Sequence, residues 1–140
     1  SDDEKTVAFN YNYFPVRKNS PVVGWLVCVR GGSIGTSFEL YSGKNFIGRG
    51  NDMDVIIPDD KSVSRSRHAV VIYDPKSKVF LVEPGMSREL FYLDDQLVLA
   101  PQLIESHQVL TIGNTDLMFV PLCGKEFDWA EQISKNEGNE

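Results

Sequence analysis

Residues 46–68 carry side chains of the types that bind phosphate groups. The stretch reads FIGRGNDMDVIIPDDKSVSRSRH, and it holds the four cations Arg49, Lys61, Arg65 and Arg67. Arginine supplies a planar, permanently charged fork of donors, and serine supplies a hydroxyl donor. A phosphate monoester carries about −1.5 to −2 charges at neutral pH and three acceptor oxygens, so these residue types complement it. The sequence therefore predicts an anion site in this stretch.

A short apolar segment, residues 55–57, separates Arg49 from the Ser-Arg-Ser-Arg sequence of residues 64–67. We expect this segment to be a β-strand, with the two polar clusters on neighbouring loops at one end of a sheet. A second explanation needs no ligand: Arg49 pairs with Asp52 or Asp54, and the serines only form turns. Charge and spacing alone leave both explanations open.

Short apolar runs recur along the whole chain, and they predict an all-β fold. The runs are rich in Val, Ile, Leu, Phe and Tyr and are separated by Gly, Asn, Asp, Pro and Ser. Such spacing is typical of a β-sandwich. The run WLVCV at residues 25–29 is apolar throughout, which favours a strand covered on both faces. The expected strands are residues 24–29, 38–41, 45–48, 55–57, 68–73, 79–83, 91–93, 96–98, 108–112 and 117–120.

Polar residues between the apolar runs predict the turns. Residues 74–78 and 112–116 are typical of hairpin turns, and residues 94–95 fit a third, although without glycine left-handed backbone costs more. The glycine-rich residues 31–35 also fit a turn, because no lysine-serine pair or helical pattern follows them as in a phosphate loop. The polar C-terminal tail predicts a short helix at residues 130–133.

Length and composition narrow the class of protein. A chain of 140 residues with 41% apolar and 11% aromatic residues has about the size and composition of one globular domain. Its apolar runs are far shorter than the ~18 residues of a membrane-spanning helix, and its acidic start lacks the core of a signal peptide. We therefore expect a soluble, cytoplasmic protein that does not bind membranes.

The formal charge of −6 is concentrated at the two ends of the chain. Residues 1–5 contribute −2 and residues 126–140 contribute −4, so residues 6–125 are neutral in sum. Nucleic acid is bound by broad basic surfaces, which this composition disfavours. A local anion site is compatible with a neutral body of the chain.

The two cysteines, Cys28 and Cys123, leave two alternatives open. A disulfide can form if the strands that carry them pair. The usual burial of cysteine favours the other alternative, two partly buried thiols in a reducing compartment. The cysteines and the two isolated histidines show no zinc-ligand spacing, so neither a metal nor another cofactor is predicted.

The order of several motifs resembles the signature of forkhead-associated (FHA) domains, which read phosphothreonine peptides. The matching motifs lie at residues 46–49, 54–57, 60–65, 68–71, 85–87, 91–93 and 110–113. The resemblance implies an eleven-stranded β-sandwich over residues 21–125, with peptide-binding loops at one end. It leaves residues 1–20 as a partly flexible extension and residues 126–140 as an acidic tail. It also implies a non-catalytic signalling module whose partner is a phosphothreonine-containing protein.

The resemblance assigns roles to individual residues. Arg49, which follows Gly48, matches the arginine that contacts the phosphate, and Ser64 matches the serine whose hydroxyl binds it. Arg65 matches a residue that often adds a phosphate contact. His68 matches a histidine that braces the binding loops from inside the fold, and Gly48 is expected to support the same loops.

One departure from the family pattern is an extra residue between Ser64 and His68. Three residues separate them where the family usually has two, so either the loop bulges outward or Ser66 takes the place of Ser64. We favour Ser64, because the residues before it stay in register. In extended backbone Arg65 and Arg67 would face one way and Ser66 the other. We also expect Arg67 to be a residue of the peptide rim.

A second departure is Arg88, which stands where the family carries an asparagine that hydrogen-bonds the peptide backbone. Asparagine both donates and accepts, whereas arginine only donates. Arg88 can therefore bind a peptide carbonyl, the phosphate or an acidic residue of the partner. It can instead pair with Glu83 or Glu89 and take no part in binding.

Two other functions compete with phosphothreonine binding. One is a phosphate-independent protein-interaction module on the same fold. The other is a hydrolase that uses Ser64 or Ser66 with His68, although the strand-turn-helix Gly-x-Ser-x-Gly motif of such enzymes is absent. The identity of the partner and the oligomeric state are not readable from the sequence.

Thr6 follows Asp2, Asp3, Glu4 and Lys5 near the start of the sequence. Its acidic surroundings suggest a kinase target whose phosphorylated form folds back onto the Arg49 site. Tethering supplies a millimolar-scale effective concentration, so even weak self-binding would compete with a partner. The simpler explanation is a disordered end of the chain.

Overall fold

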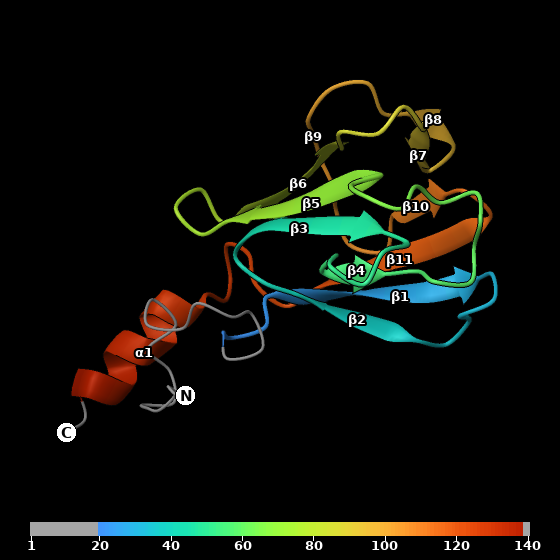
Figure 1. Cartoon of the computed structure of the whole chain (residues 1–140). Helices are drawn as coiled ribbons and strands as arrows, with labels where there is room; N and C mark the ends of the chain where they lie inside the picture. The colour runs from blue at the N-terminus through green and yellow to red at the C-terminus, as the bar shows by residue number, and fades with distance from the viewer. Residues whose placement is uncertain (1–19, 139–140) are drawn as a thin grey trace.

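Eleven short strands form two sheets in the computed structural model, which describes residues 20–138 (Figure 1). The strands are β1 (Gly24–Arg30), β2 (Ser37–Leu40), β3 (Gly43–Gly48), β4 (Val55–Ile56), β5 (Ala69–Asp74), β6 (Val79–Pro84), β7 (Phe91–Leu93), β8 (Gln96–Leu97), β9 (Gln102–Leu103), β10 (Val109–Ile112) and β11 (Thr115–Pro121). The six-stranded sheet has the order β2-β1-β11-β10-β7-β8, and the five-stranded sheet has the order β4-β3-β5-β6-β9. Helix α1 (Trp129–Gly138) follows the last strand.

The β-sandwich predicted from the sequence is confirmed. Ten of the strands lie at the predicted segments, with ends that differ by one or two residues. The eleventh strand, β9, has two exposed residues and was not located from the pattern. Helix α1 is longer than the predicted residues 130–133.

The core lies between the two sheets and is built by alternate residues of the strands. In the six-stranded sheet Leu26 of β1 stands opposite Phe119 of β11, and both are buried. Tyr73 and Phe80 of the other sheet continue this cluster, with ring centroids 4.5 Å apart, and Phe80 lies 4.7 Å from the ring of Phe119. Burial of such large apolar side chains is the main favourable term in folding.

The expectation that β1 is covered on both faces is wrong. Leu26 and Cys28 face the core, but Trp25 and Val27 are only half-buried and Val29 is 40% exposed. The register places Val120 opposite Trp25, and Met118 opposite Val27. Apolar side chains on this outer face therefore shield one another laterally, so their presence does not require a second covering layer.

The predicted hairpin turns are present, including the one without glycine. Asp94 and Asp95, between β7 and β8, both have positive φ angles, 47° and 67°. The Asp94 carboxylate accepts hydrogen bonds from the backbone N of Val109 and from Nε2 of Gln108. These bonds offset the cost of left-handed backbone in a residue with a Cβ atom.

The disulfide alternative is wrong: Cys28 and Cys123 are both free and buried. Strands β1 and β11 do pair, but Cys28 stands opposite Leu117, whereas the backbone N of Cys123 bonds to Val23 O. About five residues of β1 therefore separate them, or ~16 Å at about 3.3 Å per residue. A disulfide needs Cα atoms within about 7 Å. Burial raises the pKa of the Cys123 thiol to about 11.

The loops that carry the predicted site residues meet at one end of the sandwich. Strand β3 ends toward the loops that join it to β4 and β4 to β5, and helix α1 lies toward the opposite end (Figure 1). Within residues 20–138, no helix is long and apolar enough to cross a membrane.

Candidate functional site

Backbone hydrogen bonds tie the loop after β3 to the loop before β5. The backbone N of Arg49 donates to Ser64 O at 2.8 Å, and that of Gly50 donates to Arg65 O at 2.8 Å. Gly48 makes this close approach possible, because a Cβ atom there would lie 2.9 Å from Arg65 O. The two clusters separated in the sequence are thus direct neighbours in the fold.

The Arg49 guanidinium is oriented by a single bond. Its Nε donates to Val63 O at 3.1 Å, and its terminal nitrogens have no hydrogen-bond or ion-pair partner among residues 20–138. The alternative pairing with Asp52 or Asp54 does not occur, and the Asp54 carboxylate instead accepts from Phe46 N at 2.8 Å. Arg49 therefore presents a positioned guanidinium whose terminal donors are available to an anion.

His68 is buried and joins two loops through its ring. Its Nδ1 accepts a hydrogen bond from the backbone N of Ser64 at 3.0 Å, and its Nε2 lies 2.8 Å from Leu90 O, to which it can only donate. The ring thus holds the Ser64 loop to the β6–β7 loop. Because both nitrogens face backbone groups, neither is placed to take a proton from a serine hydroxyl, as the hydrolase alternative requires.

Between Ser64 and His68 the backbone turns at Arg67, which is left-handed with a φ of 50°. Expecting extended backbone here was wrong. The Arg67 guanidinium stacks over the ring of Phe46 at 4.4 Å, and its Nη1 lies 3.1 Å from Met86 Sδ. Arg67 is half-buried in this way, whereas Arg65 and Ser66 are exposed.

The β6–β7 loop packs directly against the backbone of Arg67. A Cβ atom at Gly85 would lie 1.7 Å from Arg67 O, so no other residue fits without moving the backbone. Arg88, on the same loop, is exposed and makes no ion pair; Glu83 pairs instead with Lys44 at 3.7 Å. The alternative in which Arg88 is neutralised by a neighbouring glutamate is therefore absent from the described part of the chain.

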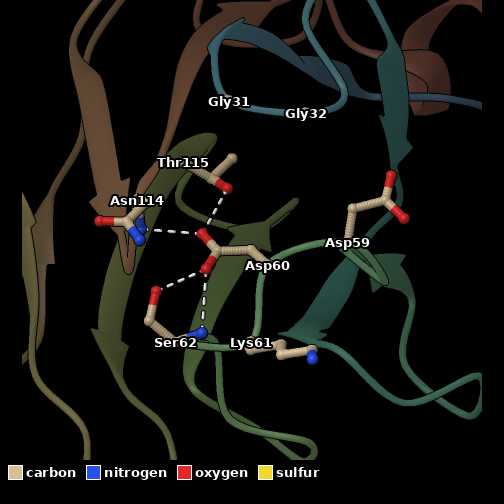
Figure 2. Close-up of a pocket in the computed structure, with 8 residues that line it drawn as sticks. All are labelled: Gly31, Gly32, Asp59, Asp60, Lys61, Ser62, Asn114 and Thr115. Carbon is tan, nitrogen blue, oxygen red and sulfur yellow. Dashed lines mark hydrogen bonds between the residues drawn. The ribbon is translucent and has the colours of Figure 1, made fainter.

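Asp60 braces the base of the Ser64 loop, a role that the sequence did not reveal. The residue is 9% exposed, and its carboxylate accepts from Ser62 N at 3.0 Å and from the Ser62 hydroxyl. It also accepts from Asn114 N at 2.8 Å and from Thr115 Oγ1 at 2.7 Å, as Figure 2 shows. Burial raises the pKa of this carboxyl, but these four hydrogen bonds outweigh it and hold the pKa below its usual value.

An open cavity of about 520 Å³ lies beside Asp60, between the turn after β1, the Ser64 loop and the β10–β11 turn. Its lining includes Gly31, Asp59 and Lys61 (Figure 2). No cluster of three or more metal-ligating side chains occurs in residues 20–138.

The arginines differ in whether they form ion pairs. Of the five within the described range, only Arg30 forms an ion pair, with Asp116 at 2.8 Å. The other four are Arg49, Arg65, Arg67 and Arg88, and all lie on the loops tied together by His68 and Gly85. Arginines without ion pairs on such loops can bind a multiply charged anion, because no existing ion pair must be broken and the loops need little rearrangement.

Comparison with known proteins gives one family and several related structures. The family model "FHA domain" matches residues 45–113, a span from β3 to the turn after β10. No significant match was found among curated proteins. A structure solved in a study of phosphothreonine-dependent FHA domain interactions is 26% identical, with a TM-score of 0.60, and covers 69% of this chain and 94% of its own.

Two further solved structures are similar over most of their length. The FhaA FHA domain, complexed with the intracellular domain of Rv3910, is 26% identical with a TM-score of 0.59, covering 69% of this chain and 98% of its own. The FHA domain of the CT664 protein from Chlamydia trachomatis is 24% identical with a TM-score of 0.63, covering 71% and 98%.

Proposed function

This chain contains a forkhead-associated domain, and from that premise we propose that it binds a phosphothreonine segment of a partner protein. The observation that carries the proposal is the set of four arginines without ion pairs on the loops after β3, before β5 and after β6. A phosphorylated side chain carries up to two negative charges in one compact group, which complements this set of positive charges. The proposed activity is recognition, without catalysis or a cofactor.

Arg49 and Ser64 are the proposed phosphate ligands. The free terminal nitrogens of Arg49 would bond two phosphate oxygens, as guanidinium groups do with oxyanions. Ser64 is half-buried, and its backbone N is held by His68, so its hydroxyl lies on a restrained residue. Arg65 is exposed on the same loop and adds charge to this side of the site.

Arg67 and Arg88 are proposed as residues of the peptide rim. Arg67 is stacked on Phe46, so it shapes the wall of the site and still carries its charge there. Arg88 has no acidic partner and stands where it can meet a carbonyl or an acidic side chain of the bound peptide. Because arginine does not accept hydrogen bonds, we expect a peptide preference that differs from that of asparagine-bearing relatives.

The proposed binding unit is residues 21–125, with residues 1–20 and 126–140 as extensions. The strands of the sandwich run from Gly24 to Pro121, inside these limits. We further propose a cytoplasmic location. Its support is that the two cysteines of the chain are both free thiols, as is usual in a reducing compartment.

The test is a titration with matched peptides. An oriented peptide library with a fixed phosphothreonine would supply a binding sequence, which is then synthesised with phosphothreonine and with plain threonine. We expect the phosphorylated form to bind at least about 100-fold more tightly, equivalent to ~2.7 kcal/mol. Equal affinity for the two peptides would favour the phosphate-independent interaction module instead.

The same titration distinguishes which of Ser64 and Ser66 contributes its hydroxyl to phosphate binding. Ser64→Ala is expected to weaken phosphopeptide binding about 10-fold, the effect of losing one hydrogen bond to a charged group. Ser66→Ala is the matched control, because Ser66 is exposed on the same loop. This variant should change the affinity less than about twofold. The reverse result would show that the longer loop brings Ser66 into the site.

A further inference from the structure

Exposed apolar side chains are concentrated in one part of the described chain. Nine large apolar residues within residues 20–138 are exposed, and six of them lie between Met86 and Leu103. Monomeric proteins rarely expose apolar side chains in a large contiguous patch, and such patches often bind another protein. The stretch from the β6–β7 loop through β7 and β8 to β9 is therefore a candidate interaction surface.

Four of these side chains share the outer face of the β7–β8 hairpin, with exposed fractions from 37% to 72%. We call them the apolar quartet: Leu90, Tyr92, Leu97 and Leu99. Tyr92 stands opposite Leu97 in the ladder, and a backbone hydrogen bond between the intervening residues extends this register to Leu90 and Leu99. The intervening residues are buried. The quartet thus forms two neighbouring cross-strand pairs that face away from the core.

Strand β8 lies at the edge of the six-stranded sheet (Figure 1). Its backbone pairs with β7 on one side, and no strand of residues 20–138 lies along its other side. An extended segment of another protein can add to such an edge through main-chain hydrogen bonds, while its alternate side chains provide specificity. The quartet supplies an apolar surface for those alternate side chains to cover.

We propose that the apolar quartet and the β8 edge bind a second stretch of the same phosphothreonine partner. This stretch is extended, has apolar side chains at alternate positions and ends in basic residues. The inference rests on the proposed function and adds a second recognition element to it.

The quartet begins beside the proposed phosphate site. The His68 ring bonds to Ser64 N through Nδ1 and to Leu90 O through Nε2, so a single imidazole ring separates the serine loop from the first quartet residue. Met86 and Arg88 lie on the same β6–β7 loop, shortly before Leu90. One extended chain can therefore occupy both places without a long linker.

The charge changes sign along the hairpin. Arg88 lies at the end near the phosphate site, whereas Asp94 and Asp95 form the turn at the other end. Asp95 is exposed, and its carboxylate takes part in no hydrogen bond or ion pair with residues 20–138. A segment with a phosphate at one end and lysine or arginine at the other complements both ends of the hairpin.

The direction of the segment follows from the direction of β8. Strand β7 runs away from the β6–β7 loop, and β8 returns toward it. A partner chain that leaves the phosphate site toward its own C-terminus would run antiparallel to β8, and antiparallel pairs are slightly more stable than parallel ones. We therefore expect the apolar stretch on the C-terminal side of the phosphothreonine. The four residues from Leu99 back to Asp95 cover about 13 Å, so about four partner residues span this distance.

The size of the quartet argues against a homodimer built on this surface. A stable interface buries about 800 Å² on each partner, with about 20–30 residues a side, whereas the quartet has four. So small a patch suits a second contact tethered to a first one, because binding at the phosphate site raises its effective concentration. Thr6, the predicted kinase target, lies outside the described residues, and nothing places it on this surface.

The experiment uses synthetic peptides built on the phosphothreonine sequence that the peptide library supplies, called the core peptide. One set carries a C-terminal extension of alternating valine and threonine that ends in two lysines, joined through no, two or four glycines. The reference peptides carry the same extension on the N-terminal side, or a glycine-serine extension on the C-terminal side. We expect the best C-terminal extension to bind about 10-fold more tightly than the core peptide, and the references to stay within about twofold of it.

The double variant Leu97→Thr, Leu99→Thr tests the surface itself. Both side chains are exposed and threonine favours strands, so the fold should be kept. We expect the variant to bind the core peptide like the wild type and to lose the gain from the extension. Leu122→Thr is the matched control and should keep the gain, because Leu122 is 36% exposed but lies beside Val23, before β1.

Two further measurements test the charge and the strand pairing. Asp95→Asn removes the charge from the turn, and asparagine also tolerates left-handed backbone, so we expect about a 2- to 3-fold loss of the gain. Since Val98 N bonds to β7, the Leu97 amide points to the open edge. Hydrogen exchange at Leu97 should slow with the extended peptide and stay unchanged with the core peptide.

The outcomes separate the two proposals. If the core peptide does not bind, the proposed function fails, and the second contact fails with it. If the core peptide binds and the C-terminal extension adds less than twofold, only the second contact fails. It also fails if the N-terminal extension gains as much, or if the double variant keeps the gain. A dimer in light scattering that the double variant dissociates would assign the quartet to a second copy of the chain and overturn the inference.

Discussion

Arg49→Ala is expected to weaken phosphothreonine-peptide binding by at least about 30-fold, or ~2 kcal/mol. The variant removes a guanidinium that the fold orients through the hydrogen bond from Nε to Val63 O. A hydrogen bond to a charged group contributes about 1.5–3 kcal/mol, and the lost fork would have made two. Titration calorimetry at fixed salt concentration measures the change.

Two further variants give this prediction its controls. Arg49→Lys keeps the charge but loses the planar fork, and we expect its affinity to fall between those of the wild type and the alanine variant. Arg30→Ala removes the arginine that pairs with Asp116, and it should leave affinity within about twofold. If Arg49→Ala binds as tightly as the wild type, the phosphate site is elsewhere.

The largest effect on stability is expected for Asp60→Ala, which should lower the free energy of unfolding by about 3 kcal/mol. The variant leaves a cavity and removes the acceptor of four hydrogen bonds, from Ser62, Asn114 and Thr115. A buried donor without a partner, here the Thr115 hydroxyl, costs about 1–3 kcal/mol, and the three part-buried donors add to this cost without adding fully. Urea denaturation measures the change.

Asp59→Ala is the matched control for Asp60. Asp59 is exposed, makes no hydrogen bond or ion pair in the described structure, and points away from the cluster in Figure 2. Its removal should change the stability by no more than about 0.5 kcal/mol. Equal stability of the two variants would contradict the bracing role of Asp60.

The pH dependence of stability gives an independent check on Asp60. Its pKa is lowered in the folded state, so its contribution is fully present above the unfolded value of about 3.9 and is lost as pH falls through the lower folded value. The stability difference between wild type and Asp60→Asn should therefore be constant near neutral pH. It should narrow below about pH 4.

The sandwich and its hairpins were predictable because their signals are local. Alternating apolar residues mark a strand wherever one of its faces is buried, and turn residues mark its end. The signal failed at β9, which has no buried residue, and on the outer face of β1, where apolar side chains are half-buried by one another. In both places neighbouring strands, rather than the segment itself, determine the burial.

The sequence by itself identified the residues that we propose for the candidate site, since Arg49, Ser64 and His68 belong to a compact motif of recognisable spacing. Only the tertiary structure decided the backbone path between Ser64 and His68, where Arg67 is left-handed and its side chain lies against Phe46 and Met86. It also revealed Asp60 as a brace, whose partners Asn114 and Thr115 lie 54 and 55 residues away. Local patterns record the preferences of neighbouring residues, whereas a buried carboxylate finds its donors only when distant loops are brought together by the packing of the two sheets.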